Sequence, residues 1–135
     1  MTDSRSYDVF LSYAAADRGW VAEFGEALRQ AGVTSFFDVY ALPPGSQWTD
    51  RLFDALRASR TVIVIISRHS VKAPWTFFEV GAAIADGKRL IPVIIEDVEL
   101  ESLPPFLQNY MALREESPTE AGRRVADAIG QVPAQ

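Results

Sequence analysis

The sequence predicts an α/β fold of the flavodoxin-like type, a three-layer sandwich in which helices cover both faces of a five-stranded parallel sheet. Short β-rich runs alternate along the chain with segments of helical periodicity, which is typical of doubly wound sheets. Two of the runs, 7–13 and 61–66, are apolar on both faces, as expected for strands that are covered on both sides. Five strands in a chain of 135 residues favour the order 2-1-3-4-5.

Each expected strand is bounded by turn or helix signals. The expected strands are 7–13, 33–37, 61–66, 90–95 and a short edge strand at about 110–113. The run 61–66 is wholly β-branched and belongs at the centre of the sheet. Pro92 cannot donate a hydrogen bond to a neighbouring strand, so we expect a bulge or an unpaired stretch in the fourth strand.

The expected helices are recognised by their ends and by their apolar spacing. They follow Asp17, occupy about 47–58 and 74–86, and run from Ser117 to about Ile129. Asp17 can cap the first of them, and Gly32 ends it in the manner of a C′ glycine. Ser117 and Glu120 have the spacing of a capping box at the start of the last. We expect one domain over 7–130, a flexible leader at 1–6 and a frayed C-terminus at 131–135.

Composition excludes several classes of function. The chain has no cysteine and one histidine, which rules out disulfides and thiol catalysis and makes a zinc site implausible. No apolar run approaches roughly 18 residues, so neither a membrane span nor a signal peptide is expected, and the cytoplasm is the expected location. A net charge of −5 gives no general attraction to nucleic acid or to an anionic membrane.

The expected strand order places a ligand crevice at the carboxyl ends of the first and third strands. The segments 12–17, 67–74 and 38–46 would border this crevice. The turn after the first strand has no glycine, which disfavours FMN binding and nucleotide-triphosphate hydrolysis. The acids that a phospho-receiver needs are absent after both strands, and no G-x-G-x-x-G motif indicates a bound redox dinucleotide.

Glu79 is the only ionisable side chain between Ala73 and Ala85, and Trp75 precedes it by one helical turn on the same face. Composition leaves two interpretations open. In the first, Glu79 lies on a thin solvated stripe and keeps the helix soluble. In the second, it faces the crevice, where low polarity strengthens its interaction with a developing positive charge.

Several segments together resemble the Toll/interleukin-1 receptor (TIR) domain over about residues 7–130. They are YDVFLSYA, FFDVYALPPGSQW, TVIVIIS, PWTFFE and LIPVII, in the order and spacing of that family. The loop that holds Pro43, Pro44 and Gly45 looks like the family's BB loop, which mediates assembly between domains. The resemblance therefore implies self-association with other TIR domains through residues 38–46.

The resemblance also implies an activity, because the NAD⁺-cleaving branch carries a glutamate in the arrangement that Trp75 and Glu79 form here. For a bacterial-type member it implies an NAD⁺ glycohydrolase or ADP-ribosyl cyclase that depends on self-assembly, with NAD⁺ as substrate and neither cofactor nor metal. Glu79 is the implied catalytic residue. The substrate-binding candidates are Ser12, Tyr13, Asp38, Arg68 and Trp75.

This chain departs from some relatives after the Ser-Tyr pair, where Ala14 and Ala15 replace basic residues. The diphosphate must then be bound elsewhere, by backbone N–H groups or by basic side chains. The candidates are Arg18, Arg68 and Lys72. Whether the product is ADP-ribose or a cyclised form stays open.

Structural roles compete with the functional ones at several positions. Tyr13 can pack in the core, Asp38 can cap a turn, Asp8 can be a structural hydrogen-bond acceptor, and His69 can be a surface residue without a role. Two further functions also stay open for the whole domain. One is a non-catalytic TIR scaffold that associates through 38–46, and the other is a nucleoside or nucleotide N-glycosidase that uses the same carboxylate.

Overall fold

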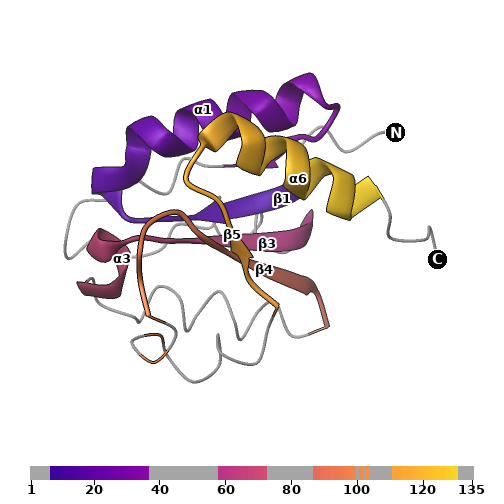
Figure 1. Cartoon of the computed structure of the whole chain (residues 1–135). Helices are drawn as coiled ribbons and strands as arrows, with labels where there is room; N and C mark the ends of the chain where they lie inside the picture. Colours follow the sequence, from indigo (N-terminus) through magenta and orange to yellow (C-terminus); the bar gives the residue numbers. More distant parts are fainter. Residues whose placement is uncertain are drawn as a thin grey trace.

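A computed structural model describes residues 7–36, 58–72, 87–99, 101, 103 and 111–130. Within these ranges, five strands form one parallel sheet in the order β2-β1-β3-β4-β5 (Figure 1). The strands are β1 Tyr7–Ser12, β2 Ser35–Phe36, β3 Ser59–Ile66, β4 Arg89–Ile94 and β5 Leu113–Arg114. The predicted α/β class with a parallel sheet is confirmed. The leader, the C-terminal residues, the loop 38–46 and the expected helix over 74–86 lie outside the described residues, as does the helix expected over 47–58 apart from its last residue.

β3 lies between β1 and β4 and is the most deeply buried strand of the described sheet. Its residues Thr61–Ile66 are all buried, and only Arg60 within the strand is exposed. The register pairs Phe10 with Val62 and Val62 with Leu90, so apolar side chains of three strands stand side by side. The β-branched run therefore occupies the interior position that its composition predicts.

Pro92 does not interrupt the sheet, so the expected bulge is wrong. β3 and β4 stay in continuous register from Thr61 and Arg89 onward, and Pro92 pairs with Val64. The Ile94 carbonyl accepts a hydrogen bond from Glu115 N–H, so the backbone of Pro92, two residues earlier, faces β5 as well. The β5 ladder begins only at Val93. The N–H group that Pro92 lacks would therefore have had no acceptor in β5.

α1 (Arg18–Gln30) and α6 (Pro118–Gly130) cover the same face of the sheet and lie side by side (Figure 1). α1 buries its side toward the core at helical spacing, with Val21, Phe24, Gly25 and Leu28 as the buried residues. The two helices approach closely at Gly122, where a Cβ atom would stand 2.5 Å from Ala27 Cβ. Only a residue without a side chain fits this crossing unchanged.

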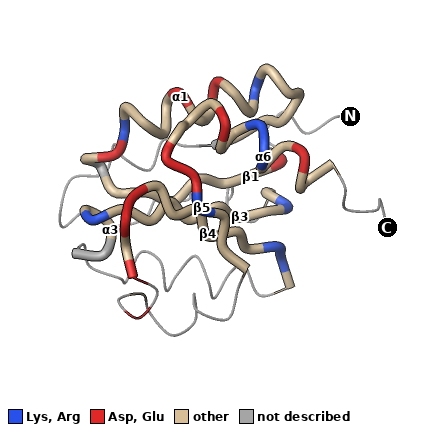
Figure 2. The backbone as a smooth tube through the Cα atoms, viewed as in Figure 1, with Lys and Arg blue, Asp and Glu red and all other residues tan. Residues whose placement is uncertain are grey.

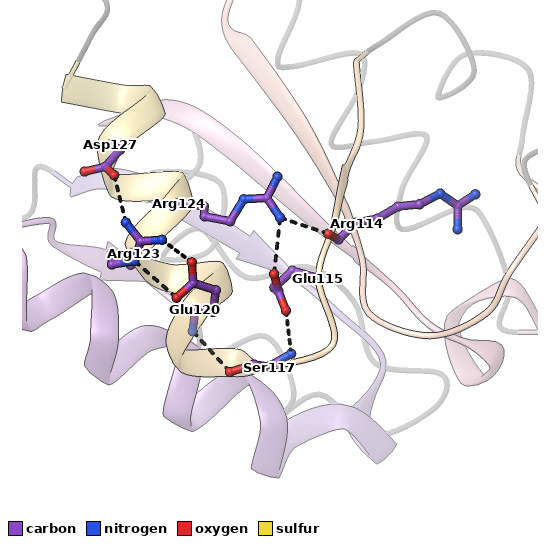
Figure 3. Close-up of polar contacts among 7 residues, drawn as sticks. All are labelled: Arg114, Glu115, Ser117, Glu120, Arg123, Arg124 and Asp127. Atoms are coloured by element: carbon purple, nitrogen blue, oxygen red, sulfur yellow. Dashed lines mark hydrogen bonds and ion pairs between the residues drawn. The ribbon is translucent and has the colours of Figure 1, made fainter.

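The C-terminal end of α1 follows the predicted chemistry, and the start of α6 follows it in part. Gly32 has a φ of +87°, as a C′ glycine requires, and Glu120 N–H donates to Ser117 Oγ at 3.2 Å. The second half of the capping box is absent, because the Glu120 carboxylate forms an ion pair with Arg123 (Figure 3). Ser117 N–H instead donates to Glu115 Oε2 at 3.2 Å.

β2 begins at Ser35 rather than at residue 33, because a side chain takes part of the backbone bonding before it; residue 37 lies outside the described residues. Asp8 Oδ2 accepts a hydrogen bond from Thr34 N–H at 2.9 Å. That amide is therefore not available to the ladder with β1. The structural role expected of Asp8 is confirmed. β5 likewise begins at Leu113 rather than at 110. Among the described helices, none has the length and apolar character needed to cross a membrane.

Candidate functional site

The carboxyl ends of β1 and β3 lie side by side in the sheet, because Ser12 is paired with Val64 two residues before β3 ends. β1 leads through a 3-10 turn, η1 (Ala15–Asp17), into α1, and β3 leads into the short helix α3 (Arg68–Lys72). Figure 1 places α3 at the end of the sheet where α1 begins. This is the position at which parallel α/β sheets hold their ligands.

Asp17 lies in this region but does not cap α1 with its side chain, which corrects the prediction. Its φ of −96° and ψ of 10° are close to helical, because the η1 turn binds Asp17 N–H to the Ala14 carbonyl at 2.9 Å. A capping side chain needs the extended backbone of a true N-cap to reach the following amides. The Asp17 carboxylate instead accepts a hydrogen bond from Ser67 Oγ, at the end of β3.

Ser67 and Ser70 form a closed set of hydrogen bonds at the start of α3, and both side chains are fully buried. Ser67 N–H donates to Ser70 Oγ at 2.7 Å, and Ser70 N–H donates to Ser67 Oγ at 3.1 Å. The Ser70 hydroxyl donates a hydrogen bond to the Ser67 carbonyl oxygen at 3.0 Å, and the Ser67 hydroxyl donates to the Asp17 carboxylate. Each hydroxyl therefore donates once and accepts once, as in a capping box built from two serines.

Glu96, just after β4, binds the same turn from another side. Its Oε1 accepts a hydrogen bond from Arg68 N–H at 2.7 Å. Red segments before α1 and after β4 lie near α3 in Figure 2, which agrees with this arrangement. The turn of residues 67–70 is thus held by one carboxylate from the start of α1 and one from the end of β4.

Burial raises the pKa of the Asp17 carboxyl above its ordinary value, since only 7% of the residue is exposed. The hydrogen bond from Ser67 and the positive charge of His69 oppose this rise, and the negative charge of Glu96 adds to it. A carboxyl group whose ionised form is penalised by the fold reduces stability at neutral pH.

Two substrate-binding candidates are buried at this point: Ser12 ends β1, and Tyr13 follows it. Tyr13 is 5% exposed and belongs to the hydrophobic core, which is the packing role considered for it. Ser12 is 3% exposed, and its Oγ makes no hydrogen bond with the described residues. Buried hydroxyls are nearly always paired, so an unpaired one beside a predicted crevice is a candidate ligand contact.

The other predicted site residues divide into two groups. Arg68 and His69 are exposed on α3, and Arg18 is exposed as the first residue of α1, so all three lie at the carboxyl end of the sheet. Lys72 ends α3. The remaining candidates lie outside the described residues and stay predictions: Glu79, Trp75, Asp38, Pro43, Pro44 and Gly45.

A hollow of about 530 Å³ lies between β5 and α6 on the flank of the sheet, away from the carboxyl ends of β1 and β3. Its charged groups pair with one another, Arg123 with Glu120 and Asp127, and Arg124 with Glu115 (Figure 3). These pairs leave neither a free anion-binding nor a free cation-binding group, and exposed pairs of this kind contribute little to stability. Across the described ranges, no group of three His, Asp or Glu side chains could hold a metal ion.

Sequence reasoning placed residues 67–74 at this region but did not single out Ser67 or Ser70, and it missed Glu96. The Ser67–Ser70 pair carries a detectable signal, because a serine three residues after another at a helix start has capping-box spacing. The contact between Asp17 and Ser67 joins residues 50 positions apart. Local sequence patterns cannot predict a contact between residues so far apart.

Comparison with known proteins adds a family to this geometry. The family model described as TIR domain matches residues 9–126. The 2′ cyclic ADP-D-ribose synthase AbTIR of Acinetobacter baumannii is 28% identical over 132 residues, which cover 91% of this chain and 49% of that protein. The NAD(+) hydrolase PdTIR of Paracoccus denitrificans is 27% identical over 119 residues, which cover 83% of this chain and 40% of that protein.

Among solved structures, a metazoan TIR-STING receptor from C. gigas in complex with 2′,3′-cGAMP superposes with a TM-score of 0.75 at 25% identity. The superposition covers 97% of this chain and 42% of that one. The chain spans between about a quarter and a half of the length of the curated relatives that it matches first.

Proposed function

Because the chain belongs to the TIR domain family, we propose that it cleaves the bond between nicotinamide and ribose in NAD⁺, with Glu79 as the catalytic carboxylate. The observation that supports this most strongly is the nature of its relatives. A 2′ cyclic ADP-D-ribose synthase and an NAD(+) hydrolase are similar to it over most of its length. The family match also includes the segment that holds Trp75 and Glu79.

The chemistry needs few groups, which suits a chain poor in histidine and cysteine. Nicotinamide in NAD⁺ is already cationic, so it leaves as a neutral molecule with the electron pair of the bond to C1′ and needs no general acid. The barrier lies in the oxocarbenium-like ribosyl cation. A carboxylate at Glu79 would stabilise this cation through charge or trap it covalently. Attack by water or by an internal nucleophile of the same molecule then completes hydrolysis or cyclisation.

The described end of the sheet supports this proposal with groups suited to the rest of NAD⁺. Ser12 would offer the substrate a hydroxyl that has no partner among the described residues, and exposed Arg68 would bind the diphosphate. Trp75, which lies outside the described residues, would offer an indole face for stacking of the nicotinamide cation, worth about 0.5–2 kcal/mol. These contacts belong to the proposal, together with a role for Asp38.

The proposal is tested by chromatography of NAD⁺ products with the wild-type chain and Glu79→Gln at high protein concentration. We expect Glu79→Gln to lower nicotinamide release by about a hundredfold or more, because it keeps the shape and removes the charge. Glu23→Gln is the matched control, since Glu23 is exposed on α1 and the net charge changes equally. Equal rates in wild type and Glu79→Gln would contradict a catalytic Glu79.

We further propose that self-association through 38–46 raises this activity. Pro43, Pro44 and Gly45 would form a stiff projecting turn for contact with a second copy. Pro44→Ala should reduce both association in sedimentation velocity and nicotinamide release, whereas Glu79→Gln should reduce release alone. A chain that associates through this loop and never releases nicotinamide would instead be the non-catalytic TIR scaffold.

A further inference from the structure

We propose that Asp17 and Glu96 are positioning residues for the proposed reaction, because together they hold the turn of residues 67–70 from which the chain continues to Trp75 and Glu79. This inference rests on the proposed function and concerns residues to which the family resemblance assigns no role here. Neither carboxylate need touch the substrate. Each would act through the backbone and side chains of the turn.

The first step of the argument is the number of hydrogen bonds that meet at this turn. Asp17 fixes the Ser67 hydroxyl, and Glu96 fixes the Arg68 amide at 2.7 Å. The exchange between Ser67 and Ser70 fixes two more amides within the same four residues. A turn in which the amides of Ser67, Arg68 and Ser70 and both serine hydroxyls are engaged has little freedom to shift.

The second step is the origin of the two carboxylates. Asp17 precedes α1 and Glu96 follows β4, so the contacts tie the end of β3 to elements on both of its sides. Ser67 and Ser70 are fully buried, which keeps water from competing for their hydrogen bonds, whereas the bond from Arg68 N–H to Glu96 is exposed. The position of the turn is therefore fixed by contacts with segments that adjoin the sheet.

The third step concerns what the turn leads to. Trp75 lies five residues after Ser70 in sequence, and Glu79 follows four residues later. A displacement of the turn would shift the start of the segment that leads to Glu79, which itself lies outside the described residues. Misplacing a catalytic group by about 1 Å can reduce its rate up to a hundredfold. The cost of keeping Asp17 buried is thereby matched by a functional gain.

The test compares kcat and KM for NAD⁺ in Glu96→Ala, Glu96→Gln and a neighbouring control, Asp97→Ala, whose side chain is exposed. Glu96→Ala removes the acceptor for Arg68 N–H, so kcat should fall about tenfold or more while KM changes by less than about threefold. Glu96→Gln keeps an acceptor oxygen and should recover most of the lost rate. Asp97→Ala should match the wild type.

The same comparison applies to Asp17→Ala and Asp17→Asn, with the folded fraction measured by circular dichroism. If Asp17→Ala fails to fold, the Glu96 variants decide the matter. Unchanged kcat in the folded alanine variants would overturn the proposal. So would an equal loss in the amide and alanine variants, because the carboxylate charge rather than the hydrogen bond would then be responsible.

A readout independent of activity separates this proposal from the proposed function. Hydrogen exchange of the Arg68 amide, followed by NMR, should accelerate about tenfold or more in Glu96→Ala and stay near the wild-type rate in Glu96→Gln. A wild-type chain that releases no nicotinamide would overturn the proposed function and the catalytic part of this inference. An unchanged exchange rate of the Arg68 amide in Glu96→Ala would contradict the claim that Glu96 holds the turn in place.

Discussion

The helical face made by α1 and α6 and the carboxyl end of β1 and β3 are built on opposite principles. Between the helices, apolar side chains fill the space, and the backbones approach so closely that Gly122 has no room for a Cβ atom. At the carboxyl end, the buried carboxyl of Asp17 has a raised pKa, and the buried Ser12 hydroxyl has no hydrogen-bond partner among the described residues. The first arrangement stabilises the fold, and the second costs stability, which is typical of functional sites.

The largest effect on stability is expected on the helical face. Gly122→Ala would place a Cβ 2.5 Å from Ala27 Cβ and 3.1 Å from the Phe24 carbonyl oxygen, so the helices must separate. We expect the free energy of unfolding in urea to fall by about 1–3 kcal/mol. Gly19→Ala is the control on α1, since its Cβ meets nothing within 4 Å. Gly19→Ala should raise the free energy of unfolding by up to about 1 kcal/mol. Equal effects in both variants would disprove the close crossing.

At the carboxyl end, removing a polar group should have the opposite effect on stability. Ser12→Ala deletes a buried hydroxyl that has no partner among the described residues, so the free energy of unfolding should stay constant or rise by up to about 1 kcal/mol. If Ser12 contacts the substrate, KM for NAD⁺ should rise about three- to tenfold. A clear loss of stability with unchanged KM would show that Ser12 is an ordinary core residue.

The smallest expected effect is a pH dependence at Asp17. A folded pKa above the unfolded value means that the carboxyl stabilises the fold below its unfolded pKa and that this contribution is lost as pH rises through the folded pKa. Asp17→Asn does not titrate. The stability of Asp17→Asn relative to wild type should therefore increase from acidic to neutral pH in urea titrations. A relative stability that declines over this range would mean that the fold favours the ionised carboxylate.

The same two regions differ in how far the sequence could predict them. The helical face could be read from local patterns, since Phe24 and Leu28 recur at helical spacing and Ser117 stands three residues before Glu120. Pro92 was expected to disturb its strand. The effect of a proline on its strand depends on whether a neighbouring strand lies beside it, and here the pairing of β4 with β5 begins only after Pro92. Local patterns carry no such information.

The carboxyl end could be located from the sequence, but its internal contacts could not. The expected strand order pointed to Ser12 and to the turn after β3, because all parallel strands end at the same edge. The partnership of Asp17 with Ser67 and of Glu96 with Arg68 depends on how distant segments meet in the folded chain. Trp75, Glu79 and the loop 38–46 lie outside the described residues and stay predictions.

The measurement that bears most directly on the central claim is an NMR titration of ¹⁵N-labelled Glu79→Gln with NAD⁺, which follows binding without turnover. A ligand crevice at the carboxyl ends of β1 and β3 predicts chemical-shift changes at the amides of Tyr13, Ser67 and Arg68. The amides of Gly122 and Arg123 on α6 should stay unchanged. Shifts that gather on α6, with none after β1 or β3, would place the ligand elsewhere and contradict the account.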